Sequence, residues 1–186
     1  MKTNLRILLL IIFIPINSMA QTESLKDIDG NTYSTIKVRN QIWMAENLRT
    51  TKFNDGTVIP LVTNSLVWRK TPQPAYCWYN NDEKTNKNLY GALYNWFVIE
   101  TGKLCPSGWH VPSDKAWLAE AYLPSGYRDE NGFFGLLDNA CFYWTSTECS
   151  TAEAYYTSVL FDGSEVERDY AFKNYGFTVR CIKNGK

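Results

Sequence analysis

The only histidine in the chain, His110, lies in the run CPSGWHVPS at residues 105–113. A histidine that acts as a general base needs a nucleophile to activate and a carboxylate to orient its ring. Asp114 is the nearest carboxylate in sequence, and it suits equally the first turn of a helix, where the helix dipole favours negative charge. No nucleophile–base pair or metal-ligand cluster can be identified in the sequence. We therefore expect a structural histidine and a protein that is not an enzyme.

Two groups of oxygen-bearing side chains are candidates for calcium binding. The run from Asp27 to Asn31 resembles the start of an EF-hand loop, but Val38 occupies the position of its essential glutamate, so Asp29-Gly30 is predicted to be a hairpin turn. The run Asn80–Glu83 also offers oxygen ligands, without the Glu-Pro-Asn, Gln-Pro-Asp or Trp-Asn-Asp motifs of calcium-dependent lectins. We expect no metal or cofactor, with calcium at these residues as the alternative.

Aromatic side chains are the candidates for ligand contact, because the apolar face of a sugar ring stacks on an indole or a phenol. The chain has seven Trp, twelve Tyr and nine Phe, and a domain of this size must bury a core, so most rings are expected in the core. Neighbouring residues of a strand point to opposite faces, so one member of an adjacent pair serves a given surface. The candidates are Trp78, Tyr79, Tyr143, Trp144, Tyr155 and Tyr156.

The first 20 residues have the layout of a secretory signal peptide. Lys2 and Arg6 form a positive start, residues 7–16 are apolar, and Ser18-Met19-Ala20 supplies small residues before a cleavage site. A membrane span needs about 20 apolar residues, twice the length of this run. We expect export to the periplasm, the cell surface or the medium, with residues 21–186 as the mature chain and no transmembrane segment in it.

The charge of the mature chain is close to balance. The full chain has 19 basic and 19 acidic residues, and two of the basic ones belong to the predicted signal peptide. Nucleic-acid binding requires clustered basic charge, so this function class is excluded. The remaining length is sufficient for one domain with a core of its own.

Five cysteines in an exported chain predict a disulfide framework with one thiol left over. The spacing of the cysteines does not select the pairs. Cys141 and Cys149 flank a short run and can close a loop of about nine residues, worth roughly 2.6 kcal/mol in the chain-entropy model. Cys181 shares one side of the predicted strand 175–182 with apolar residues and is expected to point inward.

Alternating apolar residues predict strands near both ends of the chain. An N-terminal hairpin is expected from Tyr33–Val38 and Gln41–Ala45, joined at Arg39-Asn40. Residues 50–80 contain several prolines and an Asn-Asp-Gly turn, and are expected to be irregular. Further strands are expected at Phe142–Thr147, Ala154–Phe161, Ser164–Arg168 and Tyr175–Ile182, with Asp162-Gly163 as a hairpin turn.

Two helices are expected between these strands. Large apolar residues recur at helical spacing over residues 89–100, and Gly102 suits the end of that helix. Ser113 suits the cap of a second helix with Trp117 on its buried face, and Pro124 would end it. The pattern predicts a single α+β domain with two helices and a twisted antiparallel sheet.

Several runs together resemble the Fibrobacter succinogenes major paralogous domain, a family of exported proteins from Fibrobacter and Bacteroidetes-type bacteria. In chain order they are DIDGNTY, VRNQIWMAENL, YCWYNND, YGALYNW, CPSGWHVPSDKAW, LPSGY, YWTSTE and YGFTVRC, over roughly residues 28–183. The resemblance implies a secreted or surface module of unassigned biochemical activity.

The runs GWHVPS and GFTVRC also resemble the C-type-lectin-like fold, in which helices precede a twisted antiparallel sheet and an early cysteine joins a final one. This resemblance implies a domain closed by a disulfide between Cys105 and Cys181. Such a bridge closes a loop of about 76 residues, worth roughly 4.5 kcal/mol in the chain-entropy model. A second bridge from Cys141 to Cys149 would leave Cys77 as the odd thiol.

These observations favour a non-catalytic surface or secreted module, structural or adhesive, whose partners are cell-surface proteins or glycans. The alternative is a carbohydrate-binding module that acts on extracellular polysaccharide, suggested by the aromatic content and the lectin-like resemblance. Exposed aromatic side chains gathered on one face would favour binding, whereas a buried polar cluster in a cleft around His110 would favour catalysis.

Overall fold

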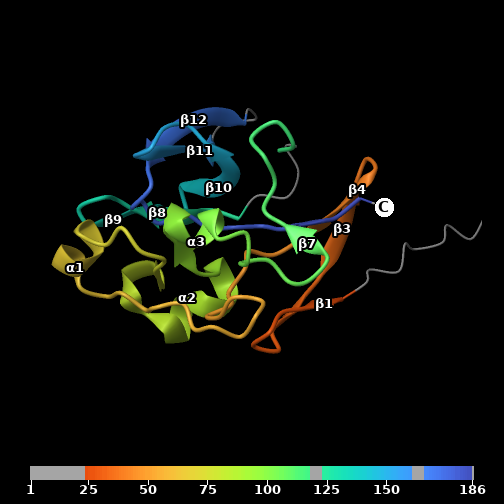
Figure 1. Cartoon of the computed structure of the whole chain (residues 1–186), viewed down its shortest axis with the longest axis horizontal. Helices are drawn as coiled ribbons and strands as arrows, with labels where there is room; N and C mark the ends of the chain where they lie inside the picture. Colours follow the sequence, from red (N-terminus) through yellow and green to blue (C-terminus); the bar gives the residue numbers. More distant parts are fainter. Residues whose placement is uncertain (1–23, 118–122, 161–165, 186) are drawn as a thin grey trace, which may run out of the picture.

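The computed structural model describes residues 24–117, 123–160 and 166–185, which form a mixed α/β structure that is mostly sheet (Figure 1). The predicted signal peptide, residues 1–20, lies outside the described residues. The described residues contain three α-helices, where two were expected, and two main sheets. Within the described part of the chain, the helices are too short or too polar to cross a membrane.

The larger sheet has five strands in the order β12-β11-β10-β8-β9, at the top of Figure 1. Its strands are β8 (Ser125–Arg128), β9 (Phe134–Leu137), β10 (Ala140–Glu148), β11 (Glu153–Leu160) and β12 (Glu167–Phe172). Neighbouring strands are antiparallel except β8 and β10, which run parallel. The strands expected at 142–147 and 154–161 are confirmed. The strand expected at 164–168 overlaps only the start of β12, which begins at Glu167 and pairs with β11 as far as Phe172; residues 164–165 lie outside the described residues. The turn expected at 162–163 lies outside the described residues.

The smaller sheet contains the expected N-terminal hairpin. Its order is β3-β4-β13-β7, and its strands are β3 (Thr35–Val38), β4 (Gln41–Met44), β13 (Ile182–Lys183) and β7 (Trp109–His110). Arg39 takes a left-handed conformation at the hairpin turn, with φ 53°. Two short antiparallel pairs complete the strands: β1 (Leu25–Lys26) with β2 (Thr32–Tyr33), and β5 (Tyr76–Cys77) with β6 (Leu93–Tyr94).

The prediction of one helix over residues 89–100 is wrong. That segment is divided among the end of α2 (Glu83–Tyr90), β6 and α3 (Trp96–Glu100). Gly91 is the physical reason, because its φ is 77° and a Cβ at this position would lie 2.7 Å from Asn47 Cβ. The backbone therefore leaves the helix where it meets the segment around Asn47. Gly102 ends α3 as expected, with φ 67°.

The segment expected to be irregular contains two short helical elements. They are α1 (Ser65–Arg69) and the 3-10 turn η1 (Tyr79–Asn81). Asn64 caps α1, because its side chain accepts hydrogen bonds from the N–H groups of Leu66 and Val67. The Asn64 cap is a local sequence signal for a helix, but the prolines near it led to the prediction of irregular structure.

The second expected helix does not begin at Ser113. The Ser113 carbonyl accepts a hydrogen bond from the Ala116 N–H at 3.0 Å and forms a turn, and residues 118–122 lie outside the described residues. Asp114 is not a first-turn helix charge. Its two carboxylate oxygens accept hydrogen bonds from the Thr147 hydroxyl and from Arg168 Nε, each at 2.6 Å. Asp114 thus ties this turn to β10 and β12.

Replacing Asp114 with Asn should destabilise the protein by about 1–3 kcal/mol at neutral pH. The Thr147 hydrogen bond lowers the pKa of the Asp114 carboxyl, burial opposes the shift, and Arg168 adds to the lowering. A lowered pKa contributes stability that is present above the unfolded-state value of about 3.9 and is lost as pH falls through the folded-state pKa. Urea unfolding at pH 7 and pH 3 should show a smaller acid loss for Asp114→Asn. An unchanged acid loss would contradict the assignment.

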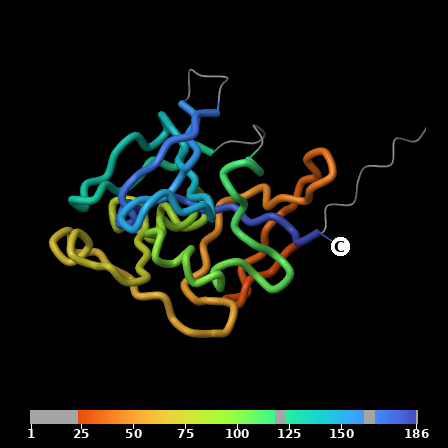
Figure 2. The backbone as a smooth tube through the Cα atoms, turned by 45° about the horizontal axis from the view of Figure 1, so that its top comes forward, coloured from red at the N-terminus to blue at the C-terminus, as the bar shows by residue number. Residues whose placement is uncertain are grey.

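Residues 175–183 cross the molecule from the larger sheet to the smaller one (Figure 2). The continuous strand expected here is replaced by β13 and by isolated bridges, which join Gly176 to Arg128, Phe177 to Tyr94 and Thr178 to Tyr143. Cys181 is buried as expected, but Thr178 and Arg180, on the expected outer side, are also only 0% and 3% exposed. Alternation fails because other elements cover both sides of the segment.

A disulfide joins Cys105 to Cys181, the pair that the fold resemblance implies. The second bridge considered, between Cys141 and Cys149, is not formed. Cys141 lies near the start of β10 and Cys149 follows its end, so about eight residues of extended chain, roughly 26 Å, separate them. A disulfide requires Cα atoms about 4.4–6.8 Å apart. Cys77 is also a free thiol, and it is buried.

Aromatic rings from distant elements form the main core. Trp144 of β10 packs against Phe177, with ring centroids 4.5 Å apart. The Trp144 indole N–H donates to the Tyr94 carbonyl at 2.8 Å, and the Trp96 indole N–H donates to the Thr145 carbonyl at 2.9 Å. Indoles in an apolar core need such partners, so these two bonds fix β6 and α3 against β10.

Arg128, at the end of β8, is fully buried. Its guanidinium donates hydrogen bonds to the carbonyls of Val62, Thr63 and Gly132, at 2.6, 2.9 and 3.2 Å. It also lies over the Trp68 ring, 4.4 Å from the centroid. Arg128 therefore connects the larger sheet to the segment that leads into α1.

Candidate functional site

Two adjoining hollows lie where β11 begins and β12 ends, and Phe172 lines both of them. The first has a volume of about 300 Å³ and the second about 520 Å³. We call the first the aromatic hollow; besides Phe172 its rings are Tyr127, Phe142, Tyr156, Tyr170, Tyr175 and Phe177. We call the second the polar hollow; its polar residues include Arg69, Lys70, Glu130, Asn131, Lys173 and Asn174.

The aromatic hollow is built from rings that pack on one another. Phe177 lies 4.8 Å from Tyr156, 5.4 Å from Phe142 and 5.5 Å from Tyr175, measured between ring centroids. Tyr127 meets the edge of Phe142 at 5.2 Å. Phe142 and Phe177 are buried, whereas the three tyrosines are half-buried. The packing therefore holds three phenol rings in place while leaving part of each accessible.

The register of β11 and β12 leaves room beside these rings. Side chains alternate along a strand, so Tyr156 and Ala154 share one face of β11. Asp169 and Ala171 are opposite them on β12. Two alanines therefore face each other across the strand pair, next to Tyr156. Their small side chains leave space beneath the edge strand.

The edge strand β12 also exposes aromatic surface, on the face of the strand pair opposite to Tyr156 and Ala154. Tyr170 and Phe172 are 52% and 49% exposed, and at a spacing of two residues they share one face of the strand. Glu153 is paired with Phe172 across the strands and also lines the aromatic hollow. Exposed rings beside a carboxylate can stack on a sugar and accept hydrogen bonds from its hydroxyls.

Burial keeps the tyrosine hydroxyls of the aromatic hollow protonated. Burial, followed by the charges of Asp169 and Glu167, raises the pKa of Tyr156 to about 12. Burial and then the neighbouring Glu130 carboxylate also raise the pKa of Tyr175. Both hydroxyls therefore remain hydrogen-bond donors at physiological pH.

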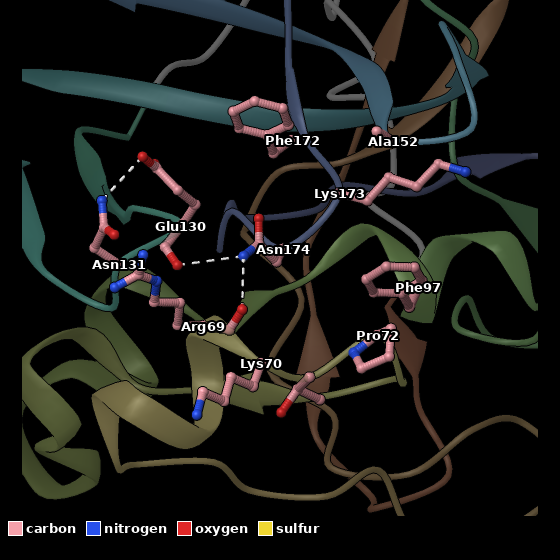
Figure 3. Close-up of a pocket in the computed structure, with 11 residues that line it drawn as sticks. Arg69, Lys70, Pro72, Phe97, Glu130, Asn131, Ala152, Phe172, Lys173 and Asn174 are labelled. Atoms are coloured by element: carbon pink, nitrogen blue, oxygen red, sulfur yellow. Dashed lines mark hydrogen bonds between the residues drawn. The ribbon is translucent and has the colours of Figure 1, made fainter.

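The polar hollow forms where three connections meet (Figure 3). The end of α1 supplies Arg69 and Lys70, the turn after β8 supplies residues 130–131, and the turn after β12 supplies residues 173–174. Asn174 lies at the centre of this arrangement in Figure 3. Its Nδ2 donates to the Glu130 carbonyl at 3.2 Å and to the Arg69 carbonyl at 3.4 Å. Asn174 thus holds two walls of the hollow together.

The cations of the polar hollow differ in exposure and in whether a carboxylate pairs with them. Lys173 is buried, forms an ion pair with Glu148 and lies over the Trp96 ring, 4.6 Å from its centroid. Arg69 and Lys70 are exposed, and neither side chain forms an ion pair with any described residue. The hollow therefore presents two exposed cations, Arg69 and Lys70, against the carboxylate of Glu130.

Comparison with known families supplies an independent finding. Residues 36–122, a little under half of the chain, match the family model described as the Fibrobacter succinogenes major domain. These residues are similar to that family. The match covers the N-terminal hairpin, the helices and the CPSGWHVPS run, as the sequence resemblance implied over a longer range. No curated protein and no solved structure matches the chain.

The Fibrobacter succinogenes major domain match includes Arg69 and Lys70 but ends before β8. The aromatic hollow therefore lies entirely beyond the matched residues, on β8 to β12 and the segment after them. The two hollows combine side chains of the matched domain with side chains of the following sheet.

Four of the six predicted aromatic candidates are buried. Trp78, Tyr79, Tyr143 and Trp144 are each at most 7% exposed and pack in core clusters. Their burial argues against the prediction that these four residues contact a ligand. The physical reason is the one expected for most rings, since these large apolar side chains fill the core of the domain.

Tyr155 and Tyr156 lie on opposite faces of β11, in agreement with strand alternation. Tyr156 lines the aromatic hollow. Tyr155 is half-buried on the other face, where Arg168 lies 3.7 Å from its ring centroid and Tyr170 meets it edge-on at 6.4 Å. The structure therefore brings one of the six predicted residues into the hollow.

Sequence reasoning missed Tyr127, Tyr170, Phe172 and Tyr175. Tyr170 and Phe172 follow Arg168 at a spacing of two residues, within a run that is otherwise mostly charged. Extending the expected strand to Phe172 would have placed both rings on an exposed edge. No comparable local signal marks Tyr127 and Tyr175, because long-range packing brings them together.

His110 is exposed, and its Nδ1 lies 2.6 Å from Asn184 Oδ1. His110 lines a separate hollow together with Ser113 and Ser146, and this hollow has a volume of about 490 Å³. Within residues 24–117, 123–160 and 166–185, no carboxylate forms a hydrogen bond or ion pair with His110, and Asp114 is engaged elsewhere. The arrangement lacks the orienting acid of a general base.

The first group of calcium candidates forms the expected turn. Asp27 accepts hydrogen bonds from the N–H groups of Asp29 and Asn31, at 3.0 and 2.9 Å. Asp29 accepts the Thr51 N–H at 2.6 Å and forms an ion pair with Lys52 at 3.1 Å. Protein donors therefore occupy these carboxylate oxygens.

The second group of calcium candidates has helix-capping roles. Asp82 accepts the Thr85 N–H at 3.1 Å at the start of α2, and Glu83 pairs with Lys87 at 2.8 Å. In the part of the chain that the structure describes, no three His, Cys, Asp or Glu side chains are grouped to hold a metal ion. The aromatic and polar hollows are therefore the best-formed candidate site.

Proposed function

We propose that the chain is an exported, non-catalytic binding module whose partner is a glycan. The observation that carries the proposal is the aromatic hollow, where three half-buried tyrosines lie next to the polar hollow. The edge strand adds the exposed rings of Tyr170 and Phe172 beside Glu153, on its other face. Sugar recognition combines these elements, since apolar ring faces stack while hydroxyls form hydrogen bonds.

We further propose that this module is a single C-type-lectin-like domain. The disulfide from Cys105 to Cys181, which joins the segment before β7 to the segment before β13, supports this view. The signal-peptide layout of residues 1–20 and the presence of a buried disulfide support export to an oxidising compartment.

Replacing Phe172 with Ala should weaken glycan binding at least about tenfold, or ~1.4 kcal/mol, because this residue lines both hollows and its ring is half exposed. A glycan array and retention on insoluble polysaccharides would first identify the ligand, and calorimetry would then measure the affinity of the variant. The fold should tolerate the change, because half of the side chain is exposed.

The matched control is Phe133→Ala. Phe133 is 69% exposed on the turn between β8 and β9, and it lines neither hollow. Its replacement should leave affinity unchanged. Absence of any retained polysaccharide, or an equal loss in both variants, would refute the proposed site.

A protein partner is the second candidate function. Leu66, Val67 and Phe133 are exposed apolar side chains, and the Ser65 hydroxyl bonds to the Gly132 carbonyl at 3.2 Å, which brings α1 next to the turn that carries Phe133. Exposed apolar groups gathered in one place favour protein contact. Adhesion to bacterial surfaces that is lost after protease treatment but survives periodate, which destroys glycans, would support this candidate instead.

A further inference from the structure

We propose that the polar hollow selects an acidic saccharide, so that the glycan carries a carboxylate or sulfate group. This inference rests on the proposed glycan binding and adds the chemical class of the ligand. The observation behind it is the placement of Arg69 and Lys70, without acidic partners among the described residues, next to the aromatic hollow.

The two hollows meet at Phe172, which lines both of them. Tyr175 of the aromatic hollow is a close neighbour of Glu130 of the polar hollow. Phe97 and Pro72 add apolar side chains to the polar hollow, as Figure 3 shows. A saccharide chain bound in the aromatic hollow would reach the charged groups across Phe172.

The charge of the polar hollow favours an anion. Lys173 is compensated by Glu148, which leaves Arg69 and Lys70 against the single carboxylate of Glu130. An arginine fork and a lysine ammonium both form charge-assisted hydrogen bonds with carboxylate or sulfate oxygens. Because both side chains are exposed, a ligand can reach them without rearrangement of the backbone.

Glu130 is the acidic residue that lines the polar hollow. Its Oε1 accepts a hydrogen bond from Asn131 Nδ2 at 3.0 Å, and its Oε2 is buried. The carboxylate is also a neighbour of Tyr175. One carboxylate against two exposed cations leaves the hollow with a net positive charge, which favours an acidic sugar over a neutral one.

The test compares three sets of oligosaccharides by calorimetry: carboxylated oligogalacturonides, sulfated chondroitin fragments and neutral cello- or xylo-oligosaccharides. The wild-type protein should bind at least one acidic set more than tenfold tighter than the neutral sets, with an affinity that falls as salt rises. The double variant Arg69→Gln, Lys70→Gln should lose at least tenfold for the acidic set and change less than twofold for neutral sugars.

Lys84→Gln is the matched control, because it removes an exposed lysine of α2 that lines neither hollow. It should leave all affinities unchanged. Preference for either anionic group supports the proposal and identifies that group. Equal binding of acidic and neutral sugars, or an unaffected double variant, overturns the acidic selectivity and leaves glycan binding intact. Failure to bind any saccharide overturns both proposals.

Discussion

Replacing Cys105 and Cys181 together with alanine should lower the free energy of unfolding by about 4.5 kcal/mol. The disulfide links residues 76 positions apart, so its loss restores the conformational freedom of a long loop to the unfolded chain. Loss of this size is a large fraction of the stability of an ordinary domain, and partial unfolding at 37 °C is expected. Urea unfolding of the double variant against the wild type measures the difference.

Two controls isolate the effect of the bridge. Cys149→Ser changes an exposed free thiol and should alter stability by less than about 0.5 kcal/mol. A reducing agent should shift the unfolding midpoint of the wild type and leave the alanine double variant unaffected. A wild-type midpoint that is insensitive to reduction would show that the disulfide does not stabilise the protein.

Replacing Arg128 with Met should cost about 3 kcal/mol and reduce glycan affinity as well. Methionine keeps much of the side-chain length but removes the donors to the carbonyls of Val62, Thr63 and Gly132. Val62 and Thr63 lead into α1, which carries Arg69 and Lys70. Loss of the guanidinium therefore loosens one wall of the polar hollow. Denaturant unfolding and calorimetry on the same variant measure the two effects.

Arg128→Lys separates charge from geometry. Lysine retains the positive charge but cannot reproduce the planar fork that reaches three carbonyls, so the variant should be intermediate in stability. If the methionine variant were as stable as the wild type, the carbonyl network would not be the stabilising feature.

Local signals in the sequence were sufficient for much of the sheet. The hairpin at Arg39-Asn40 and the strands β10 and β11 follow from alternation and turn residues within each segment. The pairing of Cys105 with Cys181 came from family resemblance, since spacing among five cysteines left the choice open. The pairing of Cys141 with Cys149 failed because proximity in sequence is not proximity along an extended strand.

Non-local contacts determined the elements that sequence periodicity missed. Apolar spacing over residues 89–100 is helical in period, yet the close approach of Gly91 to Asn47 divides the segment. Ser113 has the chemistry of a helix cap, but Asp114 is held by Thr147 and Arg168. Partners of this kind lie far away in the chain, so a window of neighbouring residues does not contain them.

The candidate site was also predictable only in part from local sequence signals. Aromatic composition indicated the kind of chemistry, namely stacking, but not which rings would reach the surface. Trp144 is buried because it packs on Phe177, whereas Phe172 is exposed because β12 lies at the edge of its sheet. Both outcomes depend on sheet order, which no local pattern encodes.

The position of residues 176–183 has a consequence for the timing of assembly. This segment pairs with β4, β6, β7, β8 and β10, all of which come earlier in the chain. The partners remain without a common neighbour until the segment reaches them, and pairings so distant in sequence form slowly. The five elements therefore come together only after this segment has been made. Because Cys181 lies in the same segment, its disulfide with Cys105 closes at that stage.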